Sequence, residues 1–156
     1  MNPFEFFIPQ NIIVGAGTLV RLPECAQKLG GTHAMLLSGP TLRKMGIVDK
    51  AAKYLEDAGM KVDIFTEIEA NPSVTTVEKA TTAFKEAGAD FIVALGGGSP
   101  MDVAKAVGVT AKYGGSITEY EGAHKVPGKI IPLIAIPTTA GTGSEVTAFS
   151  VITDHS

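Results

Sequence analysis

The chain has 156 residues, of which 45% are apolar and 19% charged, and its formal net charge is −3. This length and composition predict one globular domain that buries roughly two-thirds of its unfolded surface. The weakly acidic balance provides no basic patch, which excludes nucleic acid and anionic membranes as expected partners. No apolar run approaches the roughly 20 residues of a membrane span, and we expect no signal peptide.

The single cysteine, Cys25, rules out an internal disulfide and predicts a cytoplasmic protein. Cys25 falls inside a helical pattern, where it is expected to be a small core residue rather than a nucleophile.

The first third of the chain predicts two strands, a helix and a central strand. Residues 4–8 have the pattern of a short aromatic strand, and residues 11–15 that of a second strand after Pro9. The helix that follows ends at a glycine pair and repeats apolar residues at helical spacing, namely Leu19, Leu22, Ala26 and Leu29. Residues 34–37 are a continuous apolar run, which predicts a central strand.

The middle of the chain alternates between helix and strand. The first helix ends at Gly59 and presents one apolar face, made of Val48, Ala51, Ala52 and Leu55. A less buried strand is expected over 62–65, and a loop opens at Asn71. The next helix stops at Gly88, with Val77, Ala80 and Phe84 pointing inward.

A strand over 91–95 runs into three glycines, Gly96, Gly97 and Gly98, and a helix is predicted over 100–112. We expect Ser99 to cap this helix and Pro100 to be its first residue. A bare turn before a helix N-terminus is typical of phosphate sites. The spacing is neither G-x-G-x-x-G nor a P-loop, so an ordinary glycine turn is the alternative.

A second stretch repeats this arrangement. A buried strand is predicted over 129–137, and it runs into a turn with four hydroxyls, those of Thr138, Thr139, Thr142 and Ser144. Because a helix separates the two strands, they are expected to be parallel neighbours, with both turns at the carboxyl edge of the sheet. The alternative is ordinary turn chemistry.

The rest of the chain completes an α/β fold, a Rossmann-like parallel sheet with helices on both faces. Residues 113–128 are the least regular, with a helical turn near 117–120, and residues 146–153 are predicted to form a strand. The three histidines lie far apart in sequence, so we expect neither a metal site nor a catalytic residue. Asp102 and Lys105 are expected to be a surface ion pair of their helix.

The run from Gly96 to Lys105, followed by residues 135–147, resembles the iron-dependent (group III) alcohol dehydrogenases. The resemblance extends from about Phe7 to the last residue. Glycerol dehydrogenases and dehydroquinate synthases share the fold but match these two stretches less well. The resemblance implies a dehydroquinate synthase-like N-terminal domain over 1–156, incomplete at its C-terminal end. It also implies a helical C-terminal domain, absent from this chain, that holds Fe²⁺ or Zn²⁺ through one aspartate and three histidines.

The resemblance also implies the roles of individual residues. The pyrophosphate of the cofactor would be held by Gly96, Gly97, Gly98, Ser99 and Pro100. The adenine-ribose side would be contacted by Thr138, Thr139 and Thr142, and the nicotinamide end by Asp102, Phe149 and Val151. Asn71 is a further cofactor contact. Gly39 stands where NAD-using members have aspartate, which favours the use or tolerance of NADP. Residues 4–8 resemble an inter-subunit strand, which implies a homodimer.

The implied function is the NAD(P)-binding part of a metal-dependent alcohol dehydrogenase. Such an enzyme interconverts a small alcohol and its aldehyde or ketone by hydride transfer. Without the metal ligands, this chain by itself is expected to be inactive. The alternatives are a non-catalytic nucleotide-binding or dimerisation module, and a relative of the glycerol dehydrogenases.

Overall fold

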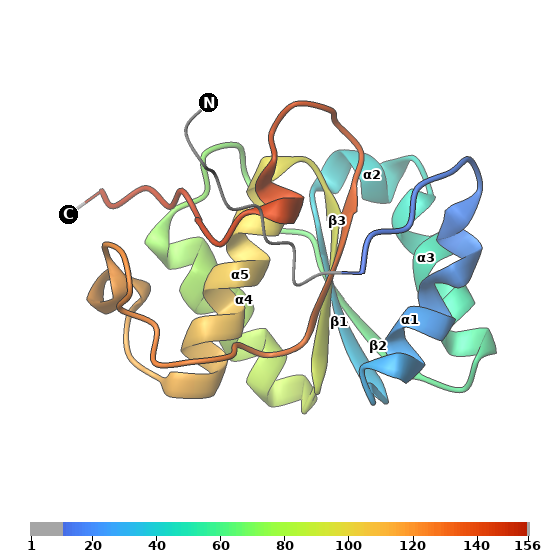
Figure 1. Cartoon of the computed structure of the whole chain (residues 1–156), viewed down its shortest axis with the longest axis horizontal. Coiled ribbons are helices and arrows are strands. Elements are labelled where there is room, and N and C mark those ends of the chain that lie inside the picture. Colours follow the sequence, from blue (N-terminus) through green and yellow to red (C-terminus); the bar gives the residue numbers. More distant parts are fainter. Residues whose placement is uncertain (1–10, 156) are drawn as a thin grey trace, which may run out of the picture.

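Four parallel strands in the order β2-β1-β3-β4 form the centre of the molecule (Figure 1). The structure is a computed structural model and describes residues 11–155. The strands are β1 (His33–Ser38), β2 (Lys61–Phe65), β3 (Phe91–Gly96) and β4 (Leu133–Pro137). All three pairings are parallel, so the four carboxyl ends share one edge, toward the top of Figure 1. The predicted α/β fold is confirmed, whereas the strand expected over residues 4–8 lies outside the described residues.

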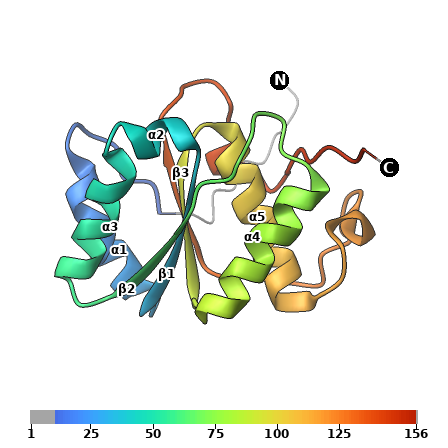
Figure 2. The same ribbon diagram turned by 180° about the vertical axis from the view of Figure 1, so that it is seen from behind.

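Helices cover both faces of the sheet (Figure 2). One face carries α1 (Leu22–Lys28) and α3 (Ile47–Asp57), and the other carries α4 (Val74–Ala87) and α5 (Gly98–Tyr113). The short helix α2 (Pro40–Lys44) follows β1 at the carboxyl edge. Three 3₁₀ turns complete the described elements, η1 (Thr18–Arg21), η2 (Ile117–Tyr120) and η3 (Ser144–Val146). The helical turn expected near 117–120 is therefore confirmed.

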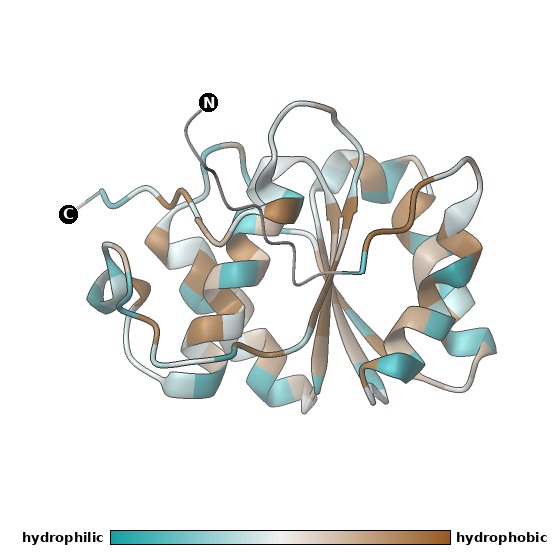
Figure 3. Cartoon of the chain, in the orientation of Figure 1, coloured by the Kyte–Doolittle hydropathy of each residue, from teal (hydrophilic) through white to brown (hydrophobic). Residues whose placement is uncertain are grey.

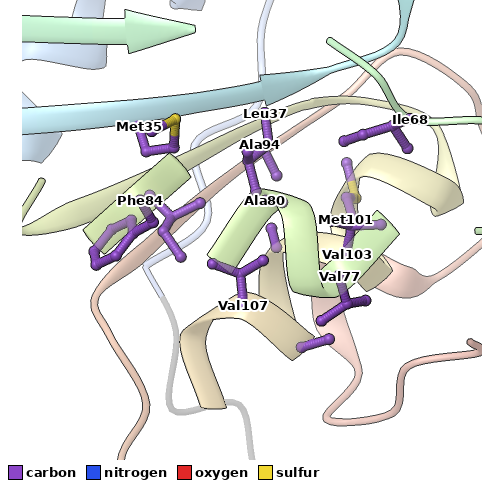
Figure 4. Packing of buried hydrophobic residues seen from close by; sticks show 13 residues of the cluster. Met35, Leu37, Ile68, Val77, Ala80, Phe84, Ala94, Met101, Val103 and Val107 are labelled. Atoms are coloured by element: carbon purple, nitrogen blue, oxygen red, sulfur yellow. The ribbon is translucent and has the colours of Figure 1, made fainter. Parts of the chain in front are cut away.

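The continuous apolar runs of β1 and β3 supply two separate cores. Successive side chains of a strand point to opposite faces of the sheet, so each run contributes residues to the core on both faces. Met35, Leu37, Ile92 and Ala94 pack with α4 and α5, as Figure 4 shows in part. Ala34, Leu36, Phe91, Val93 and Leu95 pack with α1 and α3. Hydrophobic residues accordingly concentrate on the strands and on the helix faces that meet them (Figure 3).

The buried faces of α3 and α4, and the two ends of α4, agree with the sequence pattern. Val48, Ala51, Ala52 and Leu55 are all buried in α3, and Val77, Ala80 and Phe84 are buried in α4. Ser73 caps α4 by accepting a hydrogen bond from the Thr76 N–H. Gly88 ends the same helix in a left-handed conformation, with φ of 68°. No helix among the described residues is both long and apolar enough to cross a bilayer.

Three expectations about these elements are wrong. Residues 11–15 and 146–153 do not form strands. In the described part of the chain, the segment 146–153 makes only an isolated β-bridge, between Thr153 and Ser73. Leu29, the last apolar residue of the helical pattern before the glycine pair, is exposed. The β4 strand spans Leu133–Pro137 only and is half-buried, because it pairs on one side alone within the described chain. An extended segment becomes a strand only where a neighbouring strand pairs with its backbone groups.

Candidate functional site

The N-terminus of α5 opens at the carboxyl edge of the sheet. Gly97 is its N-cap residue, the helix begins at Gly98, and no side chain of the described residues caps it. The N–H groups of Gly98 and Ser99 therefore have no acceptor within the helix, and they lie at its positive end. The expectation that Ser99 caps the helix and Pro100 begins it is wrong, because the glycine turn starts the helix earlier. The arrangement offers an anion two backbone donors.

The turn after β4 lies directly beside the glycine turn. The Thr138 N–H donates to the Gly96 carbonyl at 2.9 Å, which continues the pairing of Gly96 with Pro137. A Cβ atom placed on Gly97 would be 3.0 Å from Thr139 Oγ1. The two turns therefore meet at one edge of the sheet, as their sequence spacing predicts.

The three glycines serve different purposes. Gly96 has φ of 150°, a conformation that other residues rarely adopt, and a Cβ there would lie 2.8 Å from the Pro100 ring. Gly97 leaves room for the hydroxyl of Thr139. At Gly98 a Cβ would make only ordinary contact, 3.7 Å from Thr142. A residue with no side chain is therefore required at Gly96, whereas at Gly97 a Cβ would be tight against the side chain of Thr139.

Three of the four hydroxyl-bearing residues in the second turn are solvent-exposed, namely Thr138, Thr139 and Thr142. Thr142 Oγ1 donates to Glu145 Oε2 at 3.4 Å. The fourth hydroxyl, that of Ser144, is buried and hydrogen-bonded within the protein. The exposed threonines and the N–H groups of α5 together place several hydrogen-bond donors at this edge of the sheet.

Asp102 and Lys105 form a nearly buried pair, which corrects the expectation of a surface ion pair. Their side chains are only 14% and 10% exposed, and the ammonium lies 3.1 Å from Asp102 Oδ1. The Ser144 hydroxyl donates to the same carboxylate oxygen at 2.6 Å. The Lys105 ammonium also donates to Ser144 Oγ at 2.8 Å. The pair is buried because residues 144–153, called the strap below, cover this side of α5 (Figure 1).

The strap carries Phe149 and Val151, which are 73% and 75% exposed. The strand predicted over residues 146–153, which would have carried both side chains, does not form here. The end of the strap is held elsewhere, where the Thr153 N–H donates to the Pro72 carbonyl at 2.8 Å and the Thr153 carbonyl accepts from Val74. The strap therefore crosses from α5 to the N-terminus of α4.

Two other predicted contacts lie along the same edge. Gly39 follows β1 and is the N-cap residue of α2, one strand away from the glycine turn because Ser38 pairs with Leu95. A Cβ at Gly39 would have no atom nearer than the Ile68 carbonyl oxygen at 3.9 Å, so the position accommodates a side chain. Asn71 lies exposed in the loop after β2, with φ of 54°. The carboxyl ends of all four strands thus contribute predicted residues.

The same loop holds a carboxylate with an altered pKa. Partial burial of Glu69 raises its pKa, but hydrogen bonds from the Thr76 hydroxyl and from the Ser73 N–H and hydroxyl outweigh this and lower the pKa to about 2. The Ser73 N–H lies 2.9 Å from Glu69 Oε1, and the Thr76 hydroxyl 2.7 Å. Glu69 therefore holds a negative charge at the N-terminus of α4, where the helix dipole favours it.

The described residues do not provide a metal site. Across residues 11–155, no group of three or more His, Cys, Asp or Glu side chains is placed to hold a metal ion. His33 Nε2 lies 2.7 Å from Asp63 Oδ2, at the opposite edge of the sheet from the glycine turn. What the carboxyl edge offers chemically is a set of backbone N–H and hydroxyl donors.

Comparison with known proteins decides the family. Residues 9–156 match the family model for iron-containing alcohol dehydrogenases. The chain belongs to the iron-containing alcohol dehydrogenase family. The NAD-dependent methanol dehydrogenase of Bacillus methanolicus is 38% identical over 150 residues, which are 96% of this chain and 39% of that protein. The resemblance read from the two glycine- and threonine-rich stretches is thereby confirmed.

Solved structures agree with this assignment. A 1,3-propanediol oxidoreductase matches with a TM-score of 0.93 and 38% identity, over 99% of this chain and 40% of that one. The sulfoacetaldehyde reductase of Bifidobacterium kashiwanohense, solved in complex with NAD⁺, matches with a TM-score of 0.89 and 33% identity, over 99% of this chain and 41% of that one. The chain thus spans about 40% of the length of these relatives and corresponds to their N-terminal part.

Sequence reasoning missed the burial of Lys105 in this member of the iron-containing alcohol dehydrogenases. A signal was present, because Met101, Ala104, Lys105 and Gly108 fall at the spacing of one helix face, and the other three residues are small or apolar. A lysine on such a face is expected to be buried with acceptors around its ammonium. The strap supplies those acceptors, and only the tertiary structure shows it.

Proposed function

We propose that this chain is the dinucleotide-binding part of a metal-dependent alcohol dehydrogenase that uses NAD or NADP. The observation that carries the proposal is the juxtaposition of the open N-terminus of α5 with the threonine turn after β4. Parallel α/β sheets bind ligands at their carboxyl edge, and helix N-termini bind phosphate. Membership of a family of alcohol dehydrogenases, with a relative solved in complex with NAD⁺, supports a dinucleotide as the ligand.

In the proposed complex the pyrophosphate lies over the glycine turn. The backbone N–H groups of Gly98 and Ser99 donate to its oxygens, and Gly96, Gly97 and Pro100 shape the turn that presents them. The exposed hydroxyls of Thr138, Thr139 and Thr142 bind the adenine-ribose side, and Asn71 is a further contact. Asp102 and the strap residues Phe149 and Val151 belong to the nicotinamide end.

The proposed reaction transfers a hydride between the carbinol carbon of a small alcohol and C4 of the nicotinamide. The family implies an iron or zinc ion, which polarises the substrate oxygen when it is bound. Because the described residues do not fit such an ion, no step is assigned to a metal held by them. The role proposed for this chain is to hold and orient the nucleotide, and by itself it is inactive in alcohol oxidation.

Three finer features belong to the same proposal. Gly39 places no carboxylate near the adenine ribose, which permits NADP as well as NAD. Residues 4–8, outside the described part of the chain, are proposed to form the contact of a homodimer. The cytoplasm is the proposed location, because the chain has one cysteine and no disulfide can form within it.

Isothermal titration of the purified chain with NAD⁺ and with NADP⁺ tests the proposal. Binding of at least one dinucleotide is expected, with 1:1 stoichiometry and a dissociation constant below about 1 mM. Adenosine, which lacks phosphate, is the control and should bind far more weakly. Failure of both dinucleotides to bind would contradict the proposal.

A parallel assay tests whether this chain binds the dinucleotide without catalysis or oxidises alcohols by itself. The chain is incubated with NAD(P)⁺, a series of short alcohols, and Fe²⁺ or Zn²⁺, and the absorbance of the reduced cofactor is followed. Dinucleotide binding without turnover is expected. Alcohol oxidation by this chain alone would mean that it holds a catalytic centre of its own.

A non-catalytic nucleotide-binding or dimerisation module is the competing function. The missing metal cluster among the described residues is the observation that favours it. Expression of the complete gene separates the two functions: metal-dependent alcohol oxidation by its product supports the dehydrogenase, and its absence supports the module.

A further inference from the structure

The Lys105 ammonium lies at the centre of a set of oxygen atoms supplied by the strap. It donates to the Ser144 carbonyl at 3.0 Å and to the Ser144 hydroxyl at 2.8 Å. The carbonyls of Thr147 and Phe149 also accept from it, the first at 3.5 Å. One side chain of α5 thus contacts three residues of the strap.

Asp102, one turn earlier on α5, binds the same segment through its two carboxylate oxygens. Oδ1 accepts from the Ser144 hydroxyl at 2.6 Å, and Oδ2 accepts from the Val151 N–H at 3.1 Å. The Asp102 carbonyl accepts from the Ser150 hydroxyl at 3.2 Å. Lys105 therefore binds hydrogen-bond acceptors of the strap, and Asp102 binds hydrogen-bond donors of the strap. The positive charge of Lys105 and the negative charge of Asp102 neutralise each other.

These contacts replace the backbone pairing that a strand would have had. Residues 147–151 belong to no helix or strand, and Phe149 and Val151 expose most of their side chains. Such a segment has few apolar contacts to order it, so hydrogen bonds to a nearly buried ion pair set its position. Removing one partner of a nearly buried pair leaves the other charge uncompensated, which makes both residues necessary.

We infer that Asp102 and Lys105 are positioning residues, which fix the strap beside the open end of α5 and thereby shape the nicotinamide end of the site. The inference rests on the proposed function and refines it. Both oxygens of the Asp102 carboxylate are bound to the chain itself, so Asp102 acts on the cofactor through the strap. Phe149 and Val151 are the side chains that the pair presents.

The test compares two nucleotides that differ only at the nicotinamide. ADP-ribose has both phosphates and both riboses of NAD⁺ but lacks the ring. In Lys105→Met the affinity for NAD⁺ is expected to fall about tenfold, because the strap no longer holds Phe149 and Val151 against the nicotinamide ring. The affinity for ADP-ribose is expected to change less than about twofold, because the glycine turn is intact. A general loss of structure would weaken both ligands together.

Lys112→Met is the matched control. Lys112 lies on the same helix and donates to the Lys129 carbonyl, away from the strap. This variant should bind both nucleotides as the wild type does. Asp102→Asn is a second, milder variant. Whichever way the amide is oriented, its NH₂ group faces either a hydrogen-bond donor of the strap or the Lys105 ammonium, and it cannot accept a hydrogen bond from them. It should also lower NAD⁺ affinity more than ADP-ribose affinity.

Amide hydrogen exchange measured by mass spectrometry gives an independent readout. In Lys105→Met, exchange in peptides covering 144–153 should rise about tenfold, with β1 and α1 unchanged. The inference would be overturned if the strap of Lys105→Met exchanged at the same rate as in the wild type. It would also be overturned if Lys105→Met and Asp102→Asn each lost the same amount of affinity for NAD⁺ as for ADP-ribose. A wild type that binds neither nucleotide would instead show that the proposed function is wrong, and the inference would fail with it.

Discussion

Gly97 and Thr139 pack against one another so closely that a single added carbon at Gly97 would be in tight contact with the threonine side chain. A Cβ on Gly97 would be 3.0 Å from the Thr139 hydroxyl oxygen, tighter than most contacts between real side chains. The two residues come from different βα turns, separated along the chain by the whole of α5 and β4. Their contact joins the glycine turn to the threonine turn and gives the proposed nucleotide site its shape.

The first prediction follows from this contact. In Gly97→Val the branched side chain displaces the threonine turn and covers the exposed N–H groups of α5. Dinucleotide affinity, measured by isothermal titration, should fall at least tenfold, or about 1.4 kcal/mol. Gly98→Ala is the control, because its Cβ would lie 3.7 Å from Thr142 in ordinary contact. That variant should stay within about threefold of the wild type. Equal effects at both positions would contradict the assignment of separate roles.

The second prediction concerns the choice between NAD and NADP. Gly39→Asp introduces a carboxylate that repels a 2′-phosphate and accepts hydrogen bonds from a 2′-hydroxyl. The dissociation constant for NADP⁺ should rise at least about tenfold, while that for NAD⁺ stays or falls. Gly39→Asn is the isosteric control without the charge and should affect NADP⁺ far less. Gly39 is not the selector if the wild type strongly prefers NAD⁺, or if aspartate leaves NADP⁺ binding unchanged.

The third prediction links the altered pKa of Glu69 to stability. Its pKa in the folded protein is about 2, below the ordinary value of 4.5. The stabilising effect of the carboxylate is therefore present above about pH 4.5 and is lost as the pH falls toward 2. Glu69→Gln should lower the free energy of unfolding at pH 7 by about 1 kcal/mol or less, since solvent weakens these bonds. The difference from wild type should shrink at pH 3.

Urea unfolding followed by circular dichroism at both pH values measures this effect. Glu67→Gln is the control, because Glu67 is exposed in the same loop. Its change in stability should be small at either pH. A Glu69→Gln difference that is the same at pH 7 and pH 3 would mean that the carboxylate charge does not stabilise the N-terminus of α4.

The fourth prediction tests the packing of the core beneath α1. A Cβ on Gly31 would lie 2.4 Å from the Phe91 ring, which is fully buried. Gly31→Ala should therefore cost about 1–3 kcal/mol of unfolding free energy, as overpacking does. The double variant Gly31→Ala/Phe91→Leu should be more stable than the sum of the two single changes indicates. Strict additivity in urea unfolding would show that the glycine and the ring are not in conflict.

Sequence alone determined the parts of this protein that depend on local patterns. Continuous apolar runs identified β1 and β3, and helical spacing identified the buried faces of α3 and α4. The alternation of strand and helix requires parallel neighbours, which brings the turns after β3 and β4 to one edge. The spacing of Gly96 to Ser99 and Thr138 to Thr142 was therefore enough to predict that these two turns lie side by side.

Only the tertiary structure decided what happens between residues far apart in the chain. Residues 146–153 have the composition of a strand, yet the described chain supplies no strand beside them, and they lie as a strap on α5 instead. Asp102 and Lys105 look like a surface pair when α5 is considered alone, but the strap buries them. Local sequence sets the preference of each segment, whereas pairing and burial depend on which neighbour is in reach of its hydrogen-bonding groups.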